Sequence, residues 1–392
     1  MNKLSSIAYY VTDKISSNDI SLSEYVTTDC ILQNKKGREV ASNLPPQPCC
    51  LTRYQRGDIL IANIRPYLKK VWFADIDGGA SSDVLVFRAK EGHSPSFLYA
   101  VLLQDSFFDY VMQGAKGSKM PRGDKEQILR YEMPILSCSE ESIGTFFLNL
   151  DQKIRLNEQI NQNLEAMAKQ LYDYWFVQFD FPNEEGKPYK SSGGEMVWNE
   201  KFKREIPKGW KASMLAEEIE LQYGFPFSTE LFTEQVTSVP VVRIRDILDN
   251  SVSAYTTEEV SERYLLQKQD LLIGMDGNFH INYWTDNVSY LNQRSVRLRA
   301  KDSSNVSIVQ AKYDIQPYIK AKEERAKGST VGHLSDKDMK DLYVLVCPNK
   351  KLREKFDSIL SMIVKSRNEI TFLTKQLDEL LPLLMNGQIT IE

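Results

Sequence analysis

The chain repeats part of itself after about 211 residues, and this duplication constrains its fold more than any other feature. Three segments return in the same order: 57–61 (Gly-Asp-Ile-Leu-Ile) as 269–273 (Gln-Asp-Leu-Leu-Ile), 87–90 (Phe-Arg-Ala-Lys) as 298–301 (Leu-Arg-Ala-Lys), and 115–118 (Ala-Lys-Gly-Ser) as 326–329. The offset is 212 residues for the first segment and 211 for the other two. Because this period is far longer than a solenoid repeat, it predicts two copies of a domain-sized unit.

Each copy leads into a long segment with the alternating four-and-three spacing of a coiled-coil seam. The seam positions of the first segment are Phe147, Leu150, Ile154, Asn157, Asn161, Leu164, Ala168, Leu171 and Trp175. Those of the second are Leu352, Phe356, Ile359, Ile363, Ser366, Ile370, Leu373, Leu377, Leu380 and Leu384. At about 1.5 Å per residue each helix would be roughly 45 Å long, and so narrow an apolar seam needs a partner. We expect the two helices to pair, with the two seam asparagines fixing their register; the alternative is that each helix packs only on its own domain.

The length and punctuation of the chain divide it into several parts. A chain of 392 residues is too long for one ordinary domain. Residues 181–194 are rich in proline, glycine and serine, which is typical of a linker, and Pro382 and Gly387 are expected to end the last helix. The expected parts are a globular domain over 1–141, a central long helix over 142–180, a linker over 181–206, a second globular domain over 207–349 and a C-terminal long helix over 350–392.

The globular parts mix strand and helix signals. Runs bounded by turn residues predict strands at 59–64, 84–87, 239–244 and 295–298. Helical periodicity predicts helices at 98–112 and 309–321. The expected fold class is therefore α+β, with two globular α/β-mixed domains joined by two long antiparallel coiled-coil helices in a pseudo-twofold internal repeat.

The composition excludes several classes of protein. The chain is 42% hydrophobic and 26% charged, which suits a folded protein, and it has no apolar run long enough for a membrane span. The N-terminus has no signal-peptide pattern, so we expect a cytoplasmic protein. The five cysteines form no CxxC pair and are expected to be reduced, and the three histidines show no metal-ligand spacing.

No motif predicts an active site. The adjacent prolines Pro45 and Pro46 lack the (Asn/Asp)-Pro-Pro-aromatic context of an amino-methyltransferase loop. Residues 114–119 lack the glycine spacing of a phosphate loop. Asp180 with residues 185–187 resembles the acid and lysine of a metal-dependent nuclease, but this group lies in the linker, where no strand holds carboxylates around a metal. We therefore expect no catalytic residue, metal site or cofactor site in this chain.

Basic and polar residues gather in corresponding places of the two copies. The net charge is −4, so any nucleic-acid binding must come from such local patches. The candidates in the first copy are Lys35, Lys36, Arg38, Arg65, Tyr67, Lys69, Lys116, Ser118, Lys119 and Arg122, and those in the second are Arg243, Arg245, Lys327, Ser329 and Thr330. Lysines beside Gly-Ser turns suit phosphate oxygens and arginines suit guanine edges, so we predict that these residues bind DNA; the alternative is an ordinary solvated surface.

Several motifs, taken in order, resemble the specificity subunits of type I restriction–modification enzymes over essentially the whole chain. Residues 25–37 and 57–67 resemble the first target-recognition domain of these proteins. The matching later segments are 171–182 (the end of the central helix), 206–210 (Ile-Pro-Lys-Gly-Trp, the opening of a target-recognition domain), 331–335 (a later loop) and 380–387 (the end of the C-terminal helix). The first copy departs from the pattern because it lacks the Pro-x-Gly-Trp opening.

The resemblance implies a non-catalytic subunit in which each of two target-recognition domains reads one half of a bipartite, asymmetric site in double-stranded DNA. The two helices would set the spacing and dock two methyltransferase subunits that bind S-adenosylmethionine. Two restriction subunits that use ATP and magnesium would complete the complex. Two alternatives remain: a coiled-coil scaffold without nucleic-acid binding, and a stand-alone DNA methyltransferase or nuclease.

Overall fold

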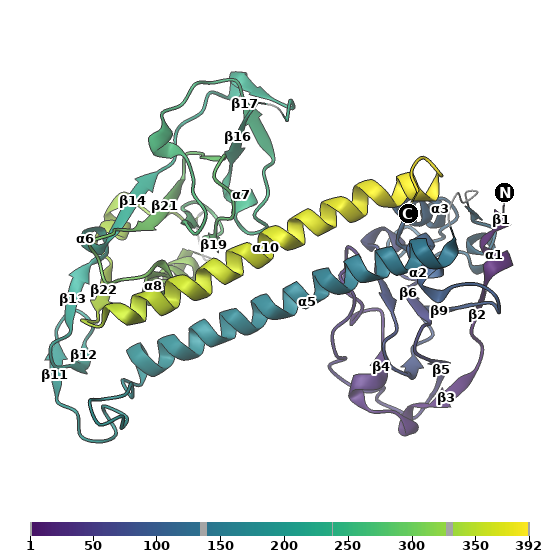
Figure 1. Cartoon of the computed structure of the whole chain (residues 1–392), viewed down its shortest axis with the longest axis horizontal. Helices are drawn as coiled ribbons and strands as arrows, with labels where there is room; N and C mark the ends of the chain where they lie inside the picture. The colour runs from purple at the N-terminus through teal and green to yellow at the C-terminus, as the bar shows by residue number, and fades with distance from the viewer. Residues whose placement is uncertain (1, 134–138, 237, 327–331, 391–392) are drawn as a thin grey trace. The chain divides into compact units, whose positions relative to one another are not determined.

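The structure, a computed structural model, describes residues 2–133, 139–236, 238–326 and 332–390. It divides into two compact units, Met1–Leu156 with Thr371–Glu392 and Asn157–Ile370. Each unit contains one α+β domain and one part of each of two long helices, α5 (Glu140–Tyr172) and α10 (Lys350–Met385) (Figure 1). This arrangement confirms the expected fold class, although the compact units divide the chain within the two long helices.

The first domain contains two four-stranded sheets. The helix-side sheet has the order β2 (Ala8–Tyr10), β9 (Val84–Ala89), β6 (Ile59–Ala62) and β7 (Val71–Phe73), all antiparallel. The outer sheet has the order β3 (Lys14–Ser16), β5 (Cys50–Tyr54), β8 (Gly78–Ala80) and β4 (Tyr25–Val26), with β4 parallel to β8. Side chains of a strand alternate between its faces, so Ile59 and Ile61 enter the core shared with the long helices while Leu60 enters the core of the outer sheet.

The second domain repeats this plan in part. Its helix-side sheet, β14 (Ile219–Tyr223), β21 (Ser295–Ala300), β18 (Leu271–Gly274) and β19 (Ile281–Tyr283), has the same antiparallel strand order as the first. Its outer sheet has the order β15 (Phe232–Thr233), β17 (Ala254–Thr256), β16 (Val239–Val242) and β20 (Tyr290–Leu291), and here the parallel pair is β16 with β20. The two domains therefore share the sheet that supports the helices and differ in the sheet beyond it.

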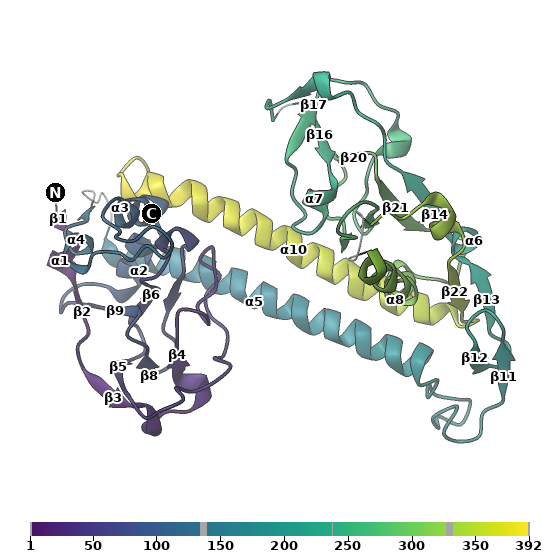
Figure 2. The same ribbon diagram turned by 180° about the vertical axis from the view of Figure 1, so that it is seen from behind.

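Short elements complete the two domains. In the first unit they are β1 (Asn2–Lys3), α1 (Leu4–Ile7), η1 (Ser17–Asp19), η2 (Leu22–Glu24), η3 (Pro66–Leu68), α2 (Pro95–Leu103), α3 (Asp105–Gln113), α4 (Lys125–Ile128) and β10 (Glu132–Met133). In the second they are η4 (Asp173–Val177), β11 (Met196–Asn199), β12 (Arg204–Pro207), β13 (Lys211–Met214), α6 (Leu215–Glu218), η5 (Thr229–Leu231), α7 (Ile244–Ile247), η6 (Glu262–Tyr264), α8 (Ile308–Ala326), α9 (Asp336–Lys340) and β22 (Tyr343–Val346). The helix α8 packs on β21 and β22 (Figure 2).

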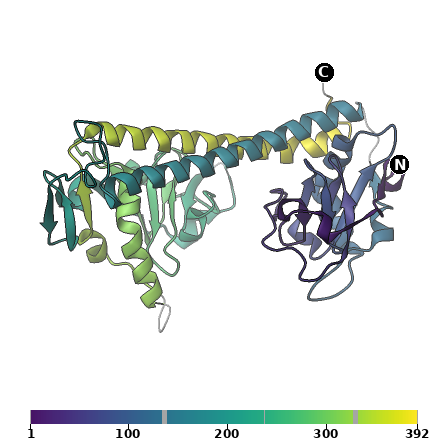
Figure 3. The ribbon, with the colours of Figure 1, turned by 90° about the horizontal axis from the view of Figure 1, so that it is seen from below.

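The two long helices run against each other inside each unit (Figure 3). In the first unit, Leu150 and Ile154 of α5 pack in the same hydrophobic core as Leu377 of α10. In the second, the Ser366 hydroxyl of α10 donates a hydrogen bond of 3.2 Å to the backbone oxygen of Asn157 on α5. The seam positions thus face the partner helix, and the helices are antiparallel because residue numbers rise along one as they fall along the other.

The predicted elements are present, but their bounds differ from the observed ones; the strand expected at 59–64, for example, ends at Ala62. The helix expected at 98–112 is two helices, α2 and α3, because Gln104 adopts an extended backbone conformation between them. The strand expected at 239–244 ends at Val242, since Asp246 accepts a hydrogen bond from the backbone N–H of Arg243 and so starts helix α7. The helix expected at 309–321 continues to Ala326, with Pro317 inside it.

The ends of the long helices also differ from the sequence-based expectation. Helix α5 begins two residues earlier than expected and continues into the π-helical turn η4. Pro382 lies inside α10, and the helix ends at Met385, just before Gly387 adopts the left-handed φ of 68°. The proline fails to end the helix because its ring removes only one backbone donor close to the helix terminus.

The segment expected as a linker over 181–206 carries regular structure. Its second half forms the hairpin β11–β12. Its first residue, Phe181, is buried, with its ring 4.7 Å from that of Trp175 and 5.2 Å from that of Trp210. Proline and glycine content did not predict this because the aromatic packing depends on residues distant in the sequence.

Candidate nucleic-acid interface

Backbone hydrogen bonds bring the three basic segments of the first domain together. The N–H groups of Asn34 and Lys35 donate to the oxygens of Leu68 and Lys69, each at 2.9 Å. The N–H of Arg65 donates to the oxygen of Pro121 at 2.8 Å. Residues 33–38, 63–70 and 115–123, which are far apart in the sequence, therefore form one surface that we call the loop cluster.

The middle segment of the loop cluster holds two side chains out in solvent. Arg65 and Lys69 adopt left-handed backbone conformations, with φ of 53° and 50°, on either side of η3. Such conformations cost non-glycine residues roughly 1 kcal/mol each and persist only when the surrounding structure imposes them. They turn the chain so that Arg65 is exposed and Tyr67 is 50% exposed. A cationic and an aromatic side chain thus project next to each other.

Three of the predicted DNA-binding residues have structural partners instead. Lys35 and Lys69 both bind the carboxylate of Asp105, at 2.8 and 2.9 Å. Burial alone would raise the pKa of Asp105, but the hydrogen bonds from both lysines outweigh burial and lower it. Arg38 lies 4.3 Å from the ring centre of Trp72 and donates to the oxygen of Ser23 at 2.9 Å. The positive charges of Lys35, Lys69 and Arg38 therefore already have partners within the first unit. The sequence pattern could not indicate these partners.

The remaining basic residues of the loop cluster are exposed. Lys116 pairs with Asp124 at 2.9 Å and Arg122 with Asp83 at 3.1 Å. Ion pairs between groups this exposed add little to stability, so phosphate oxygens can replace the carboxylates. Lys36, Ser118 and Lys119 are exposed too, and these two lysines form no ion pair within the described part of the chain. The exposed residues are the ones able to meet a polyanion.

Of the predicted DNA-binding residues of the second domain, the structure describes only the two arginines. Arg243 is half-buried and donates to the backbone oxygen of Ser253 at 2.7 Å, which makes it mainly structural. Arg245 is exposed and donates to the Ser253 hydroxyl at 3.2 Å. Lys327, Ser329 and Thr330 lie outside the described residues, and so does the loop repeat to which they belong.

A carboxylate-centred cluster of the second domain was missed by sequence reasoning. Asp276, which follows β18, lies 2.5 Å from Nδ1 of His333 and accepts a hydrogen bond from Arg294. Burial would raise the pKa of Asp276, but the hydrogen bonds from Arg294 and His333 prevail and lower it. The repeat offset of 211 residues could have revealed this cluster, because it aligns His333 with Arg122 and Arg294 with Asp83.

The predicted seam residues all lie on long-helix faces that are buried or half-buried. Buried members are Asn157, Asn161, Ile363, Leu373 and Leu377, and half-buried members are Leu150, Ile154, Leu164, Leu171, Ile370 and Leu380. The Asn157 amide nitrogen and the Asn161 side-chain oxygen are buried without a hydrogen-bond partner in the described structure. Such unsatisfied amides weaken a helix pair and restrict it to few registers.

The described residues contain neither a metal-ligand cluster nor a helix suited to a membrane. No group of three or more histidine, cysteine, aspartate and glutamate side chains there could hold a metal ion. In the same residues, no helix combines the length and the apolar character that crossing a bilayer requires.

Comparisons with known proteins point to one family. The family model for the type I restriction modification DNA specificity domain matches residues 207–380. The type I restriction enzyme MjaIX specificity subunit of Methanocaldococcus jannaschii is 22% identical over 396 residues, covering 96% of this chain and 87% of that protein. The EcoBI specificity subunit of Escherichia coli is 29% identical over 163 residues, which are 40% of this chain and 34% of that protein.

A solved structure supports the same fold. The crystal structure of a type I restriction–modification system S subunit from M. genitalium matches with a TM-score of 0.58 at 14% identity. The match covers 100% of this chain and 96% of that one. At this identity the likeness concerns the fold alone.

Proposed function

Because this chain belongs to the family of type I restriction–modification specificity subunits, we propose that it reads a bipartite, asymmetric DNA site with one half-site for each domain. Within such an enzyme the chain is the non-catalytic component that recognises DNA. The observation that carries the proposal is the loop cluster, where three separate segments converge and expose Arg65, Lys119 and Arg122 on one domain. Exposed cations at this density suit a phosphate backbone.

The asymmetry of the proposed site follows from how the two domains differ. Both keep the helix-side sheet in the same strand order, but their outer sheets differ in order. The basic loop cluster of the first domain also has no charge-for-charge copy in the second, where Asp276 takes the place of an apolar residue, Ile64. Domains that present different side chains to a duplex read different base sequences.

The partners of the proposed complex follow from the family. We expect two methyltransferase subunits, which carry S-adenosylmethionine, and two restriction subunits, which use ATP and magnesium. The long helices α5 and α10 offer these subunits exposed side chains along the faces that point away from the seam. Methylation and cleavage would occur in these partners, at DNA positioned by this chain.

The two alternatives find less support. A stand-alone methyltransferase or nuclease is disfavoured because the matched relatives are specificity subunits. A scaffold without nucleic-acid binding gives no reason for the exposed cations of the loop cluster.

Two measurements test the proposal. The purified chain should retain double-stranded DNA, and its affinity should fall linearly with the logarithm of salt concentration because phosphate contacts release counterions. Methyl transfer should be absent for the chain alone and appear when a methyltransferase subunit is added. Methyl transfer by the isolated chain, or a DNA affinity that does not change with salt concentration, would contradict the proposal.

A further inference from the structure

The second domain contains a cationic pocket that the repeated sequence does not account for. The pocket lies beside the C-terminal half of α8, and its described lining residues are Tyr318, Ala321, Lys322, Arg325 and His333. Three of these five side chains are cationic or can become so, and a fourth carries a phenol hydroxyl.

Carboxylates outside the lining hold three of these groups in place. Asp338, at the start of α9, pairs with Lys322 and accepts a hydrogen bond of 3.2 Å from the Tyr318 hydroxyl. The hydrogen bond from Lys322 lowers the pKa of Asp338, so this carboxylate stays ionised. Asp276 holds His333 in the same way.

The third cationic side chain of the lining, Arg325, differs in this respect from Lys322 and His333. Arg325 is exposed and forms no ion pair within the described ranges. Arg294, which shares Asp276 with His333, adds a further cation nearby. Lys322 and Arg294 are each matched by a carboxylate, Asp338 and Asp276, so Arg325 is left as the cation of the lining that no ion pair of the described residues neutralises. The pocket therefore favours an anion.

The pocket is not required by the fold that the two domains share. The repeat offset is 211 residues both before and after α8, so each α8 residue has a counterpart in the first domain. The counterparts of Tyr318, Lys322 and Arg325 are Phe107, Val111 and Gly114. The first two of these are buried core residues. A phenol and a lysine thus replace two core residues, and an arginine replaces a glycine, so a polar site stands where the first domain has apolar packing.

We infer that this pocket binds a phosphate group, specifically a backbone phosphodiester of the DNA half-site that the second domain reads. The guanidinium of Arg325 can donate two parallel hydrogen bonds to two phosphate oxygens. Lys322, His333 and the Tyr318 hydroxyl offer further donors around the same anion. This inference rests on the proposed function, because it assigns the anion to DNA.

The test compares two neighbouring cations on α8 in the full-length chain. Arg325→Ala removes the pocket cation that forms no ion pair with any described residue. Lys320→Ala is the matched control because Lys320 is exposed on the same helix but is not among the described residues that line the pocket. DNA retention is measured over a range of salt concentrations. We expect Arg325→Ala to weaken binding several-fold and to reduce the salt slope by about 1, while Lys320→Ala changes both far less. Equal effects of the two substitutions would overturn the inference.

A second measurement is independent of DNA. The chain has three histidines, so the ring-proton signals of His333 can be assigned by comparison with His333→Gln. Millimolar inorganic phosphate should shift the His333 signals in the wild type and in Lys320→Ala, but not in Arg325→Ala. No shift in the wild type would overturn the site itself. If phosphate shifts the His333 signals but Arg325→Ala leaves DNA binding unchanged, the pocket binds anions and its assignment to DNA is overturned. If the wild type retains no DNA at all, the proposed function fails, while the phosphate titration still decides whether the pocket binds anions.

Discussion

Arg299 donates two hydrogen bonds of 2.7 Å each to the buried carboxylate of Asp270. The first domain repeats this pair, since Arg88 donates two hydrogen bonds of 2.7 Å to the buried Asp58. In both domains the aspartate directly precedes one inner strand of the helix-side sheet, β6 or β18. The arginine lies on the other inner strand, β9 or β21. Two of the three repeated sequence segments therefore contain the two halves of this ion pair in both domains.

Breaking the pair should destabilise the second domain. Asp270→Asn preserves the shape of the side chain but leaves the Arg299 charge without its partner, which costs about 3 kcal/mol for a buried pair of this kind. Urea unfolding followed by circular dichroism measures the effect. Lys268→Ala, at an exposed position two residues earlier, is the control and should change the unfolding free energy by less than about 0.5 kcal/mol. Equal midpoints for the two variants would contradict the prediction.

The stability of the second unit should fall as pH rises from about 4 to 7. Burial raises the pKa of Asp314 to about 6, although its hydrogen bond of 2.7 Å from the Tyr172 hydroxyl opposes the shift. The unfolded chain has the ordinary value near 3.8. Between these two values the folded state holds a proton that the unfolded state has released, so folding is favoured at low pH. The contribution is fully present below the unfolded pKa and is lost as pH rises through the folded one.

The shift of Asp314 corresponds to no more than about 3 kcal/mol. Urea unfolding at several pH values should show the decline in the wild type. Asp314→Asn cannot titrate, so the difference in unfolding free energy between wild type and variant should change over this interval. A difference that stays constant between pH 4 and 7 would rule out the raised pKa.

Two lysines of the loop cluster should behave differently when replaced. Lys119→Ala removes an exposed cation without an ion pair in the described structure, so it should weaken DNA binding and lower the salt slope by about 1 while leaving stability unchanged. Lys35→Ala removes a partner of Asp105 and should lower the unfolding free energy by about 1 kcal/mol. DNA retention and thermal unfolding of both variants measure the contrast. The distinction fails if Lys35→Ala reduces the salt slope as much as Lys119→Ala does.

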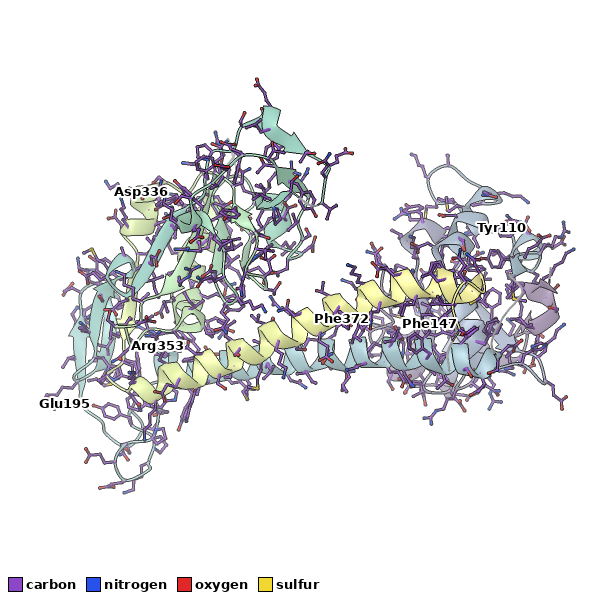
Figure 4. All side chains as sticks on the ribbon, turned by 45° about the horizontal axis from the view of Figure 1, so that its top comes forward. Tyr110, Phe147, Glu195, Asp336, Arg353 and Phe372 are labelled. Atoms are coloured by element: carbon purple, nitrogen blue, oxygen red, sulfur yellow. The ribbon has the colours of Figure 1, made fainter. Side chains whose placement is uncertain are left out.

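Two positions on α10 should separate the helix seam from the exposed face. Leu377 is buried in the core that also contains Phe147, whereas Phe372 is 58% exposed (Figure 4). Leu377→Asp places a charge in apolar surroundings and should cost at least about 3 kcal/mol. Phe372→Asp should cost less than about 1 kcal/mol, because water already reaches that side chain. Similar melting temperatures for the two variants would show that the seam in the first unit does not carry the packing.

Periodicity and repetition determined much of the architecture from the sequence alone. The heptad spacing identified the seam residues of both long helices, and the offset of 211 residues identified the two related domains. These signals are readable because hydrophobic periods and duplicated segments are local properties of the chain.

The tertiary structure alone decided which charged residues are available to a ligand. Lys35 and Lys119 belong to equally basic stretches, yet only Lys35 has its charge committed to an aspartate about 70 residues away in the chain. The same holds for Arg325, whose pocket exists only because His333 and the end of α8 lie together. A side chain's partners depend on contacts between distant segments, which composition and spacing do not encode. The sequence therefore specified the framework, and three-dimensional packing selected the residues on that framework that can bind.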